Sequence, residues 1–448
     1  MMIRIIRYFF WAAIALFVWK PLGAMTLDEA VRKALANNPQ IQEARAEATS
    51  VRAKVSEAKS HRNPTLGFTT AIAIMSDAPE MKMPEMHLDA LGGMPIKLPN
   101  MPLSDTTFSI GTLNLTMPII TGGRIRHGVN QAKAGAEAMD AGYEATREEI
   151  AFFTIKAYLT AVLAGKVEQV NLEAHDTINE HLRQATRLFE ERQISRYDVL
   201  RAETEVANAK KRLTDAQNSK QLATAFLQNL IGNSPEQEIA LDTDILLLPE
   251  IVEPYDKLAD EAVQHSHVLN ALEAKDRMYR EAEAGAKAER RPTLAAFASQ
   301  VLYSNEQPFT IPSTLAGAVL NVPIFDGGTS SAKAAGQRAL RKKNEYELER
   351  TRNNIRLEVM QHSLDLKNSK SALESSEKAI ESAVESLRLA ERRFTEGIGT
   401  GIEISDATLA LLVARTNEVQ ARYQFNLANY GLAKTSNKLW QLLNIADE

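Results

Sequence analysis

The chain of 448 residues contains no cysteine. This absence excludes disulfide bonds, thiolate metal sites and cysteine nucleophiles together. The chain also has no surplus of basic residues, since 52 Lys and Arg face 57 Asp and Glu and the net charge is −5. It therefore does not carry the positive field that nucleic-acid binding needs. The eight histidines are scattered along the sequence, and no arrangement of catalytic residues stands out. We expect neither an enzyme nor a protein with a cofactor.

Long apolar runs are confined to the N-terminus. Two arginines precede an apolar run from Tyr8 to Trp19, and small residues follow up to Ala24. This pattern is typical of a secretory signal peptide, so we expect residues 1–24 to be removed on export by the Sec pathway, with an uncleaved anchor as the alternative. No cysteine would stand at the new N-terminus, and a lipoprotein is not expected. No later stretch approaches 18 apolar residues, so a transmembrane helix is not expected either.

Proline is missing from two long windows, residues 119–234 and 324–448. Because proline breaks helices and both windows are rich in good helix formers, each window predicts long helices. The pattern breaks once near the middle of each window, at residues 193–198 and 397–401. Each window therefore predicts a helical hairpin.

The spacing of apolar residues in the first hairpin indicates how its helices pack. From Val206 to Leu230 they recur three and four positions apart, and only Lys220 interrupts the series. This heptad seam is typical of coiled coils. A single helix from Gly123 to Glu191 would be roughly 100 Å long at about 1.5 Å per residue. Such a length suits a rod or the wall of a tunnel.

The chain repeats itself with an offset of 205 residues. Residues 182–191 align with residues 387–396, and six of the ten positions are identical. The same offset relates two Pro-Ile-x-x-Gly-Gly sequences. Because glycine accepts the dihedral angles of a tight joint, we expect these sequences to mark junctions between a strand and a helix, with an ordinary loop as the alternative. The junction residues are Pro118, Gly122, Gly123, Pro323, Gly327 and Gly328.

Ahead of each hairpin the sequence predicts a short helix and two strands. Residues 65–74 alternate between apolar residues and small or polar ones, and ten residues is the length of a transmembrane β-strand. Residues 106–117, 293–303 and 313–322 are weaker candidates. Taken alone, each of these patterns would also fit a strand at the edge of a soluble sheet. The prediction of membrane strands therefore depends on their duplication in an exported chain.

The duplication divides the exported chain into two structural repeats, residues 25–250 and 251–448. In the first repeat we expect a short helix, two strands separated by a long loop, a hairpin at residues 123–231 and a linker at residues 232–250. The second repeat follows the same order without the long loop, and its hairpin covers residues 328–442. The fold is therefore mainly α with a small β part.

Four strands cannot span a bilayer alone, because hydrocarbon tolerates no unpaired sheet edge. Two copies would supply eight strands, and a barrel of that size is filled by its own side chains. A conducting pore therefore needs at least three copies and twelve strands. These considerations exclude a monomer and disfavour a dimer, but they do not choose three copies over four.

The chain resembles the TolC family of outer-membrane efflux proteins. The resemblance is carried by the opening residues 26–31 with Asn38 and Pro39, by the duplicated junctions and by the hairpin ends, and it covers essentially the whole exported chain. It implies a homotrimer with a coiled-coil α-helical barrel in the periplasm and a twelve-stranded β-barrel in the outer membrane. It also implies a passive duct of a tripartite efflux or type I secretion system, whose partners are a periplasmic adaptor and an inner-membrane pump. The alternatives are a periplasmic adaptor, which has one hairpin and a β-rich remainder, and a structural coiled-coil protein without channel activity.

Acidic residues at the hairpin ends are candidates for the lining of the periplasmic entrance. The second end contains Glu403 and Asp406, and the first contains Asp198, with Arg201 in the place of the second acid. In a trimer these carboxylates would form a ring that favours cations and raises the cost of closing the entrance. The alternative is that they cap the returning helices. Three glycines predict a flexible turn at the second end: Gly397, Gly399 and Gly401.

The loop at residues 75–105 separates the two strands of the first repeat and is rich in methionine and proline. Thioether sulfur suits Cu(I) and Ag(I), and the candidate ligands are Met81, Met83, Met86 and His87. They show no fixed ligand spacing, so a flexible surface loop is the favoured interpretation.

A peptide of residues 73–105 titrated with Cu(I) tests this interpretation. We expect it to bind no more tightly than a scrambled peptide of the same composition. Clearly tighter binding by the natural order of residues would establish a soft-metal site in the loop.

Overall fold

The computed structural model describes residues 24–77, 80–84, 86–88, 94–96, 99, 101–102, 106–237, 239–243, 247–251, 253–305 and 312–443. The predicted signal peptide covers residues 1–24, and all of it except Ala24 lies outside the described residues. Contacts divide the chain into two compact units. The first unit joins Met1–Ala46, Ala141–Asn270 and Glu349–Glu448; the second joins Glu47–Asp140 and Ala271–Leu348. Each unit therefore takes its elements from both sequence repeats.

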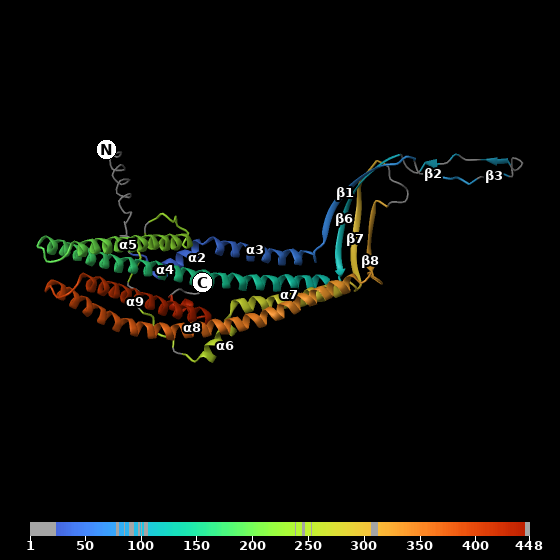
Figure 1. Cartoon of the computed structure of the whole chain (residues 1–448). Helices are drawn as coiled ribbons and strands as arrows, with labels where there is room; N and C mark the ends of the chain where they lie inside the picture. The colour runs from blue at the N-terminus through green and yellow to red at the C-terminus, as the bar shows by residue number, and fades with distance from the viewer. Residues whose placement is uncertain are drawn as a thin grey trace, which may run out of the picture. The chain divides into compact units, whose positions relative to one another are not determined.

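The two repeats contain matching elements in the same order (Figure 1). The helices of each matching pair have the same length, whereas the strands differ in length. Those of the first repeat are α2 (Leu27–Asn37), α3 (Pro39–Ser60), β1 (Thr65–Ile74), β6 (Thr107–Ile120), α4 (Arg124–Glu190) and α5 (Arg196–Leu230). Those of the second are α6 (Tyr255–His265), α7 (His267–Ala288), β7 (Thr293–Ser304), β8 (Thr314–Asn321), α8 (Thr329–Thr395) and α9 (Gly401–Thr435), followed by α10 (Leu439–Leu442). The long helices α4 and α8 have 67 residues each, and the returning helices α5 and α9 have 35 each.

The helical segment before the strands is broken in both repeats. The sequence predicted one short helix, whereas the structure has two helices of 11 and 22 residues in each copy. The break lies at Asn38 (ψ 126°) and at Ser266 (ψ 116°), which both adopt extended backbone. At Asn38 the cause is the following proline, which disfavours helical dihedral angles in the residue before it.

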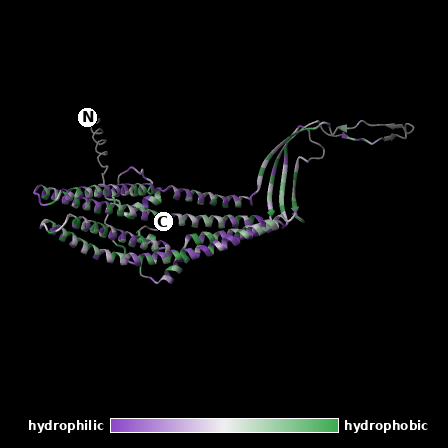
Figure 2. Ribbon diagram, viewed as in Figure 1, coloured by the Kyte–Doolittle hydropathy of each residue, from purple (hydrophilic) through white to green (hydrophobic). Residues whose placement is uncertain are grey.

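The second unit contains a four-stranded antiparallel sheet, in the order β1-β6-β7-β8. None of the four strands contains a charged residue, and hydrophobic residues run along all of them (Figure 2). One face presents exposed apolar side chains such as Leu66, Phe68 and Ile72. On the other face, the Ser299 hydroxyl donates a hydrogen bond to Asn114 Oδ1 (2.8 Å). In the first repeat the sheet thus has an apolar face and a face with polar, uncharged groups. In β8 both faces carry exposed apolar side chains, because Leu315 and Val319 lie on the face of Ser299 and Leu320 lies on the other.

The loop at residues 75–105 contains short paired strands in its described part. β2 (Glu80–Met81) pairs with β5 (Met101–Pro102), and β3 (Met86–Leu88) pairs with β4 (Met94–Ile96). Met81 lies opposite Met101, and His87 lies opposite Pro95. Met81 and Met83 are exposed. Among the described residues, His, Asp and Glu form no group that could hold a metal ion.

The core of the first unit anchors the first described residues of the chain. The Tyr158 hydroxyl donates hydrogen bonds to the carbonyl oxygens of Met25 (2.7 Å) and Asp242 (3.0 Å). Met25 also pairs with the linker, because its N–H donates to the Ala240 carbonyl (2.7 Å). Trp440 is buried in the neighbouring cluster, 5.6 Å from the Arg147 guanidinium, so it does not contribute to an aromatic belt at a membrane surface.

Within the described residues, α4 is the one helix long and apolar enough to cross a membrane by length and composition alone. The sequence did not lead us to expect such a stretch. Half of its apolar window is buried inside the protein, and Ile155, Tyr158 and Leu159 on α4 belong to the core clusters. This apolar stretch is therefore accounted for by packing within the first unit.

The heptad seam of α5 packs as its spacing predicts. Ala209, Ala216 and Leu227 are buried. Lys220, which interrupts the series, reaches across to α4, where its ammonium lies 2.7 Å from Glu168 Oε2. In the second hairpin the seam contains many small residues, because Ser369, Ser376, Ala383 and Ala390 are buried along it.

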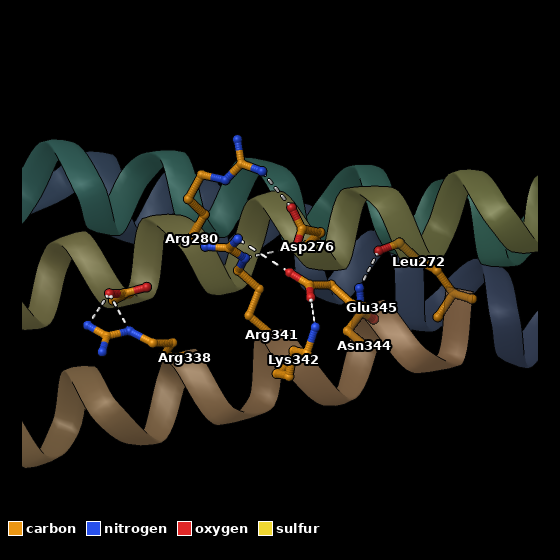
Figure 3. A network of polar contacts seen from close by, with 9 residues as sticks. Leu272, Asp276, Arg280, Arg338, Arg341, Lys342, Asn344 and Glu345 are labelled. Atoms are coloured by element: carbon orange, nitrogen blue, oxygen red, sulfur yellow. Dashed lines mark hydrogen bonds and ion pairs between the residues drawn. The ribbon is translucent and has the colours of Figure 1, made fainter. Parts of the chain in front are cut away.

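Polar contacts set the relative position of α7 and α8 in the second unit (Figure 3). The buried Asn344 donates a hydrogen bond from Nδ2 to the Leu272 carbonyl (2.9 Å). Arg338 on α8 pairs with Glu283 on α7 (3.0 Å). Hydrogen bonds from Lys287 and Arg338 lower the pKa of the Glu283 carboxyl. A buried amide that bonds a single carbonyl admits one register between the two helices.

Both long helices end in the same motif. Arg192 (φ 59°) and Gly397 (φ 72°) are equivalent under the 205 offset, and both adopt left-handed backbone. The next residue of each donates its N–H back into the helix, from Gln193 to Leu188 (2.8 Å) and from Ile398 to Arg393 (3.0 Å). This is the Schellman ending, which favours glycine at the left-handed position.

We expect Gly397→Ala to destabilise the second hairpin by about 1–2 kcal/mol, because a Cβ disfavours left-handed backbone. Gly336→Ala is the matched control: Gly336 lies inside α8 with open space around it, and alanine is the better helix former there by about 0.5–1 kcal/mol. Thermal unfolding of the full chain followed by circular dichroism should show midpoint shifts of opposite sign. A midpoint unchanged by Gly397→Ala would contradict the expected strain.

Candidate functional site

The first hairpin end is closed by a capping box on α5. The Ser195 hydroxyl donates a hydrogen bond to Asp198 Oδ2 (2.7 Å), and so does the Ser195 N–H (3.1 Å). In return the Asp198 N–H donates to Ser195 Oγ (3.4 Å). Asp198, predicted as a residue of the entrance ring, is thus a helix cap that also lies exposed at the surface.

At the second hairpin end, the acidic residue equivalent to Asp198 has a different partner. Glu403 corresponds to Asp198 under the 205 offset, but Thr400 forms no side-chain cap for α9. Glu403 instead pairs with Arg393 near the end of α8, at 3.1 Å. Asp406 lies one turn further along α9 and is exposed. Of the two acids at this end, Asp406 is therefore the one whose charge is not offset by an arginine close by.

Each of the three glycines at the second end has a steric reason. Gly397 supplies the left-handed residue after α8. A Cβ on Gly399 would lie 2.8 Å from Arg393 Cβ, and a Cβ on Gly401 would lie 2.8 Å from His181 Nε2. A Cβ at Gly399 or Gly401 would therefore collide with a neighbouring side chain; the flexibility of the turn stays a prediction.

His181 joins the two hairpin ends, although no sequence pattern singled it out. It lies on α4, its ring packs edge-on against Phe394 of α8 with centroids 4.8 Å apart, and its Nε2 faces Gly401 at the start of α9. The side chain is buried, and Nδ1 has no hydrogen-bond partner among the described residues. Burial lowers the pKa of His181.

The strand-to-helix junctions are nearly identical in the two repeats. The paired glycines have φ values of 61° and 90° in the first copy (Gly122, Gly123) and of 63° and 85° in the second (Gly327, Gly328). These left-handed values explain why glycine occupies all four positions. The prolines differ: Pro118 lies within β6, opposite Ala295 of β7, whereas Pro323 follows the end of β8.

Two residues that sequence reasoning missed complete the junctions. Arg291 closes the first, where its guanidinium donates a hydrogen bond to the Gly122 carbonyl (3.2 Å). Asp326 closes the second by capping α8 through the side chain and the N–H of Ser330 and the N–H of Gly328. These hydrogen bonds, above all that from the Ser330 hydroxyl, lower the pKa of Asp326 to about 2. A search for Asp followed by helix-forming residues could have found this cap.

The family comparison decides what kind of protein has this architecture. The outer membrane efflux protein family matches residues 30–233 and 258–438. The chain belongs to the outer membrane efflux protein family. The two matched segments start 228 residues apart and end 205 residues apart. The sequence repeats show the same two offsets: Pro-Thr-Leu recurs after 228 residues at the start of the first strand of each repeat (residues 64–66 and 292–294), and the junctions recur after 205.

Solved structures of outer-membrane channels share the fold. The chain is similar to the outer-membrane channel OprN, at 19% identity and a TM-score of 0.75 over 93% of this chain and 90% of that one. It is also similar to VceC from Vibrio cholerae, at 18% identity and a TM-score of 0.71 over 94% and 97%. CmeC from Campylobacter jejuni matches at 16% identity and a TM-score of 0.76 over 92% and 86%. No curated protein matches the chain.

Members of the outer membrane efflux protein family are outer-membrane efflux channels of tripartite systems, and this chain is a subunit of such a channel. Channels of the family are trimers that work with an adaptor and an inner-membrane pump. The prediction of a TolC-family fold, mainly α with a small β part, is confirmed.

The buried His181 predicts that the contact between the hairpin ends depends on pH. Because its pKa lies below the ordinary value of 6.5, the stability of this contact is complete above pH 6.5 and decreases as the pH falls below it. Between pH 7.5 and 5.5 the ratio of separated to joined ends should rise by at most about tenfold per chain.

Pulsed EPR distances between labels at Arg196→Cys and Thr400→Cys measure this ratio, in chains diluted with unlabelled protein. We expect the distribution to broaden at pH 5.5. His181→Leu should remove this response, and His175→Leu, on the same helix, should keep it. A response that survives His181→Leu would assign the pH dependence to another group.

Proposed function

We propose that three copies of this chain form a passive duct across the outer membrane. Each copy would contribute four strands to a twelve-stranded barrel and two hairpins to a helical barrel in the periplasm. The observation that carries the proposal is the uncharged sheet with exposed apolar side chains and two edge strands, β1 and β8, that have no partner within the described chain. In hydrocarbon each unpaired backbone group costs several kcal/mol, so the edges must meet other edges.

The helical hairpins provide surfaces suited to an adaptor. A groove runs between α8 and α9 and is lined largely by small and amide side chains, among them Ser369, Ser376, Ala379 and Ala421. Small side chains let the backbone of another helix approach closely. A periplasmic adaptor with a helical hairpin fits this groove, and the adaptor would connect the duct to an inner-membrane pump. Export by a Sec signal peptide at residues 1–24, without lipid attachment, would bring the chain to this place.

The entrance would be lined by acidic residues at the hairpin ends, and the three candidates differ in their free charge. Asp198 is held in a capping box and Glu403 is paired with Arg393. Asp406 is exposed one turn inside α9. Asp406 would therefore contribute most to a ring that attracts cations, with a smaller share from Glu403 and Asp198.

Single-channel recordings in planar bilayers test both the duct and its entrance. We expect the purified protein to conduct and to be blocked by multivalent cations added on the side of the hairpin ends. Asp406→Asn should weaken this block more than Glu403→Gln, because Arg393 already offsets the charge of Glu403.

The absence of any conductance from correctly assembled protein would refute the duct. Conductance with a block that survives the double variant Asp406→Asn/Glu403→Gln would keep the duct and remove the acidic ring.

A further inference from the structure

The strand register inside the chain repeats under the same offsets as the sequence. β7 pairs with β8 through eight residue pairs, from Thr293–Asn321 to Gln300–Thr314. Moving the first member back by 228 and the second by 205 converts all eight into pairs of β1 with β6, from Thr65–Thr116 to Ile72–Ser109. The two repeats therefore pair their strands residue for residue in the same way. A pairing seen in one repeat can thus be used to predict the equivalent pairing in the other.

The remaining joint in the sheet, between β6 and β7, connects the first repeat to the second. Its register places Asn114 opposite Ser299 and Leu115 opposite Ala298. The side chains of Asn114 and Ser299 are hydrogen-bonded across this joint. Among the described strands this joint occurs once, because β1 and β8 are the two edges of the sheet.

We infer that β8 pairs with β1 of a second copy of this chain in the register that the β6–β7 joint defines. The same two offsets place Val319 opposite Ala71 of the neighbouring copy and Leu320 opposite Thr70 of the neighbouring copy. This inference rests on the proposed oligomeric duct and specifies which residues meet at its subunit joint. The edge residues concerned are exposed within one chain, with Val319 at 55% and Leu320 at 65%.

Exposed apolar residues next to the edge fit the transferred joint. Ile120 lies opposite Leu294 in the β6–β7 joint, and the equivalent pair is Phe325 with Leu66 of the neighbouring copy. Phe325 is 86% exposed and Leu66 is 66% exposed within the single chain, and the joint would cover both.

The junction glycines point to the same neighbour. In the first junction a Cβ on Gly122 would lie 2.6 Å from Arg291 Cβ, whereas a Cβ on Gly327 would meet no other side chain or backbone atom within 4 Å beyond its chain neighbours. The equivalent of Arg291 under the 228 offset is Asn63, which precedes β1. Asn63 of the neighbouring copy would thus occupy the open side of Gly327.

Disulfide crosslinking tests the register directly, because the natural chain has no cysteine. The two predicted pairs are Val319→Cys with Ala71→Cys and Leu320→Cys with Thr70→Cys. Directly opposite residues in antiparallel strands have Cα atoms about 4.5–5.5 Å apart, within the range of a disulfide. Neighbouring pairs alternate between the close and the wide spacing, so at least one of the two lies at the close spacing.

Three matched double variants control the experiment. Asn114→Cys with Ser299→Cys is the equivalent pair inside one chain and should form an intrachain disulfide. Val319→Cys with Ala73→Cys, and Val319→Cys with Thr69→Cys, keep the same face of the sheet but shift the register by two residues. They should crosslink at least tenfold less, since diagonal neighbours are about 7–8 Å apart.

The full-length protein is oxidised in membranes, denatured and separated on gels without reductant, and the same preparations are recorded in bilayers. We expect the predicted pairs to give covalent dimers and trimers, which reductant converts back to monomers by cleaving the disulfides. Preferential crosslinking of a shifted pair in conducting channels would overturn the register and leave the duct intact. A working intrachain control with no interchain product from any pair and no conductance would instead refute the proposed oligomeric duct.

Discussion

The backbone of a strand at the edge of a sheet carries hydrogen-bonding groups that a bilayer cannot satisfy, and the rest of this structure depends on that constraint. The four strands are free of charge and expose apolar side chains, which suits hydrocarbon. Their number is too small for closure, so the edges β1 and β8 must find partners outside the chain. Several copies of the chain must therefore associate so that the backbone groups of the two edge strands are hydrogen-bonded within the membrane.

Duplication gives the chain a simple way to meet this requirement. A sheet made of two equivalent strand pairs already contains one joint between repeats, and a joint between subunits can reuse its geometry. The helical part is duplicated in the same way, because each hairpin consists of one helix of 67 residues and one of 35. The repeats diverge in the loop of residues 75–105, which is longer than its counterpart in the second repeat, and at the hairpin ends.

The hairpin ends show how equivalent positions acquire different roles. Asp198 caps α5, whereas Glu403 in the same place pairs with Arg393. The cause is local: Ser195 forms a capping box with Asp198, but Thr400 makes no side-chain cap, and an arginine stands near the end of α8 where the first copy has Leu188. His181 and Gly401 then fit together across the two ends, because a larger residue at position 401 would collide with the imidazole.

Much of the architecture follows from the sequence, because its signals are periodic or repeated. Proline-free windows predict the hairpins, alternation predicts the strand of residues 65–74, and the 205 offset predicts the duplicated junctions. Local signals could not reveal the break at Ser266, where no proline marks it, or the seam of α8, where small serines and alanines are buried.

Tertiary structure alone decided which side chains meet. The Tyr158 hydrogen bonds, the Lys220–Glu168 pair and the burial of His181 each join residues that lie far apart in the chain. Sequence patterns report the intrinsic preference of short segments, whereas these contacts depend on how two faces are brought together by everything between them. The sequence by itself determined the repeat, the elements and the need for partners; the packed structure determined the register in which they meet.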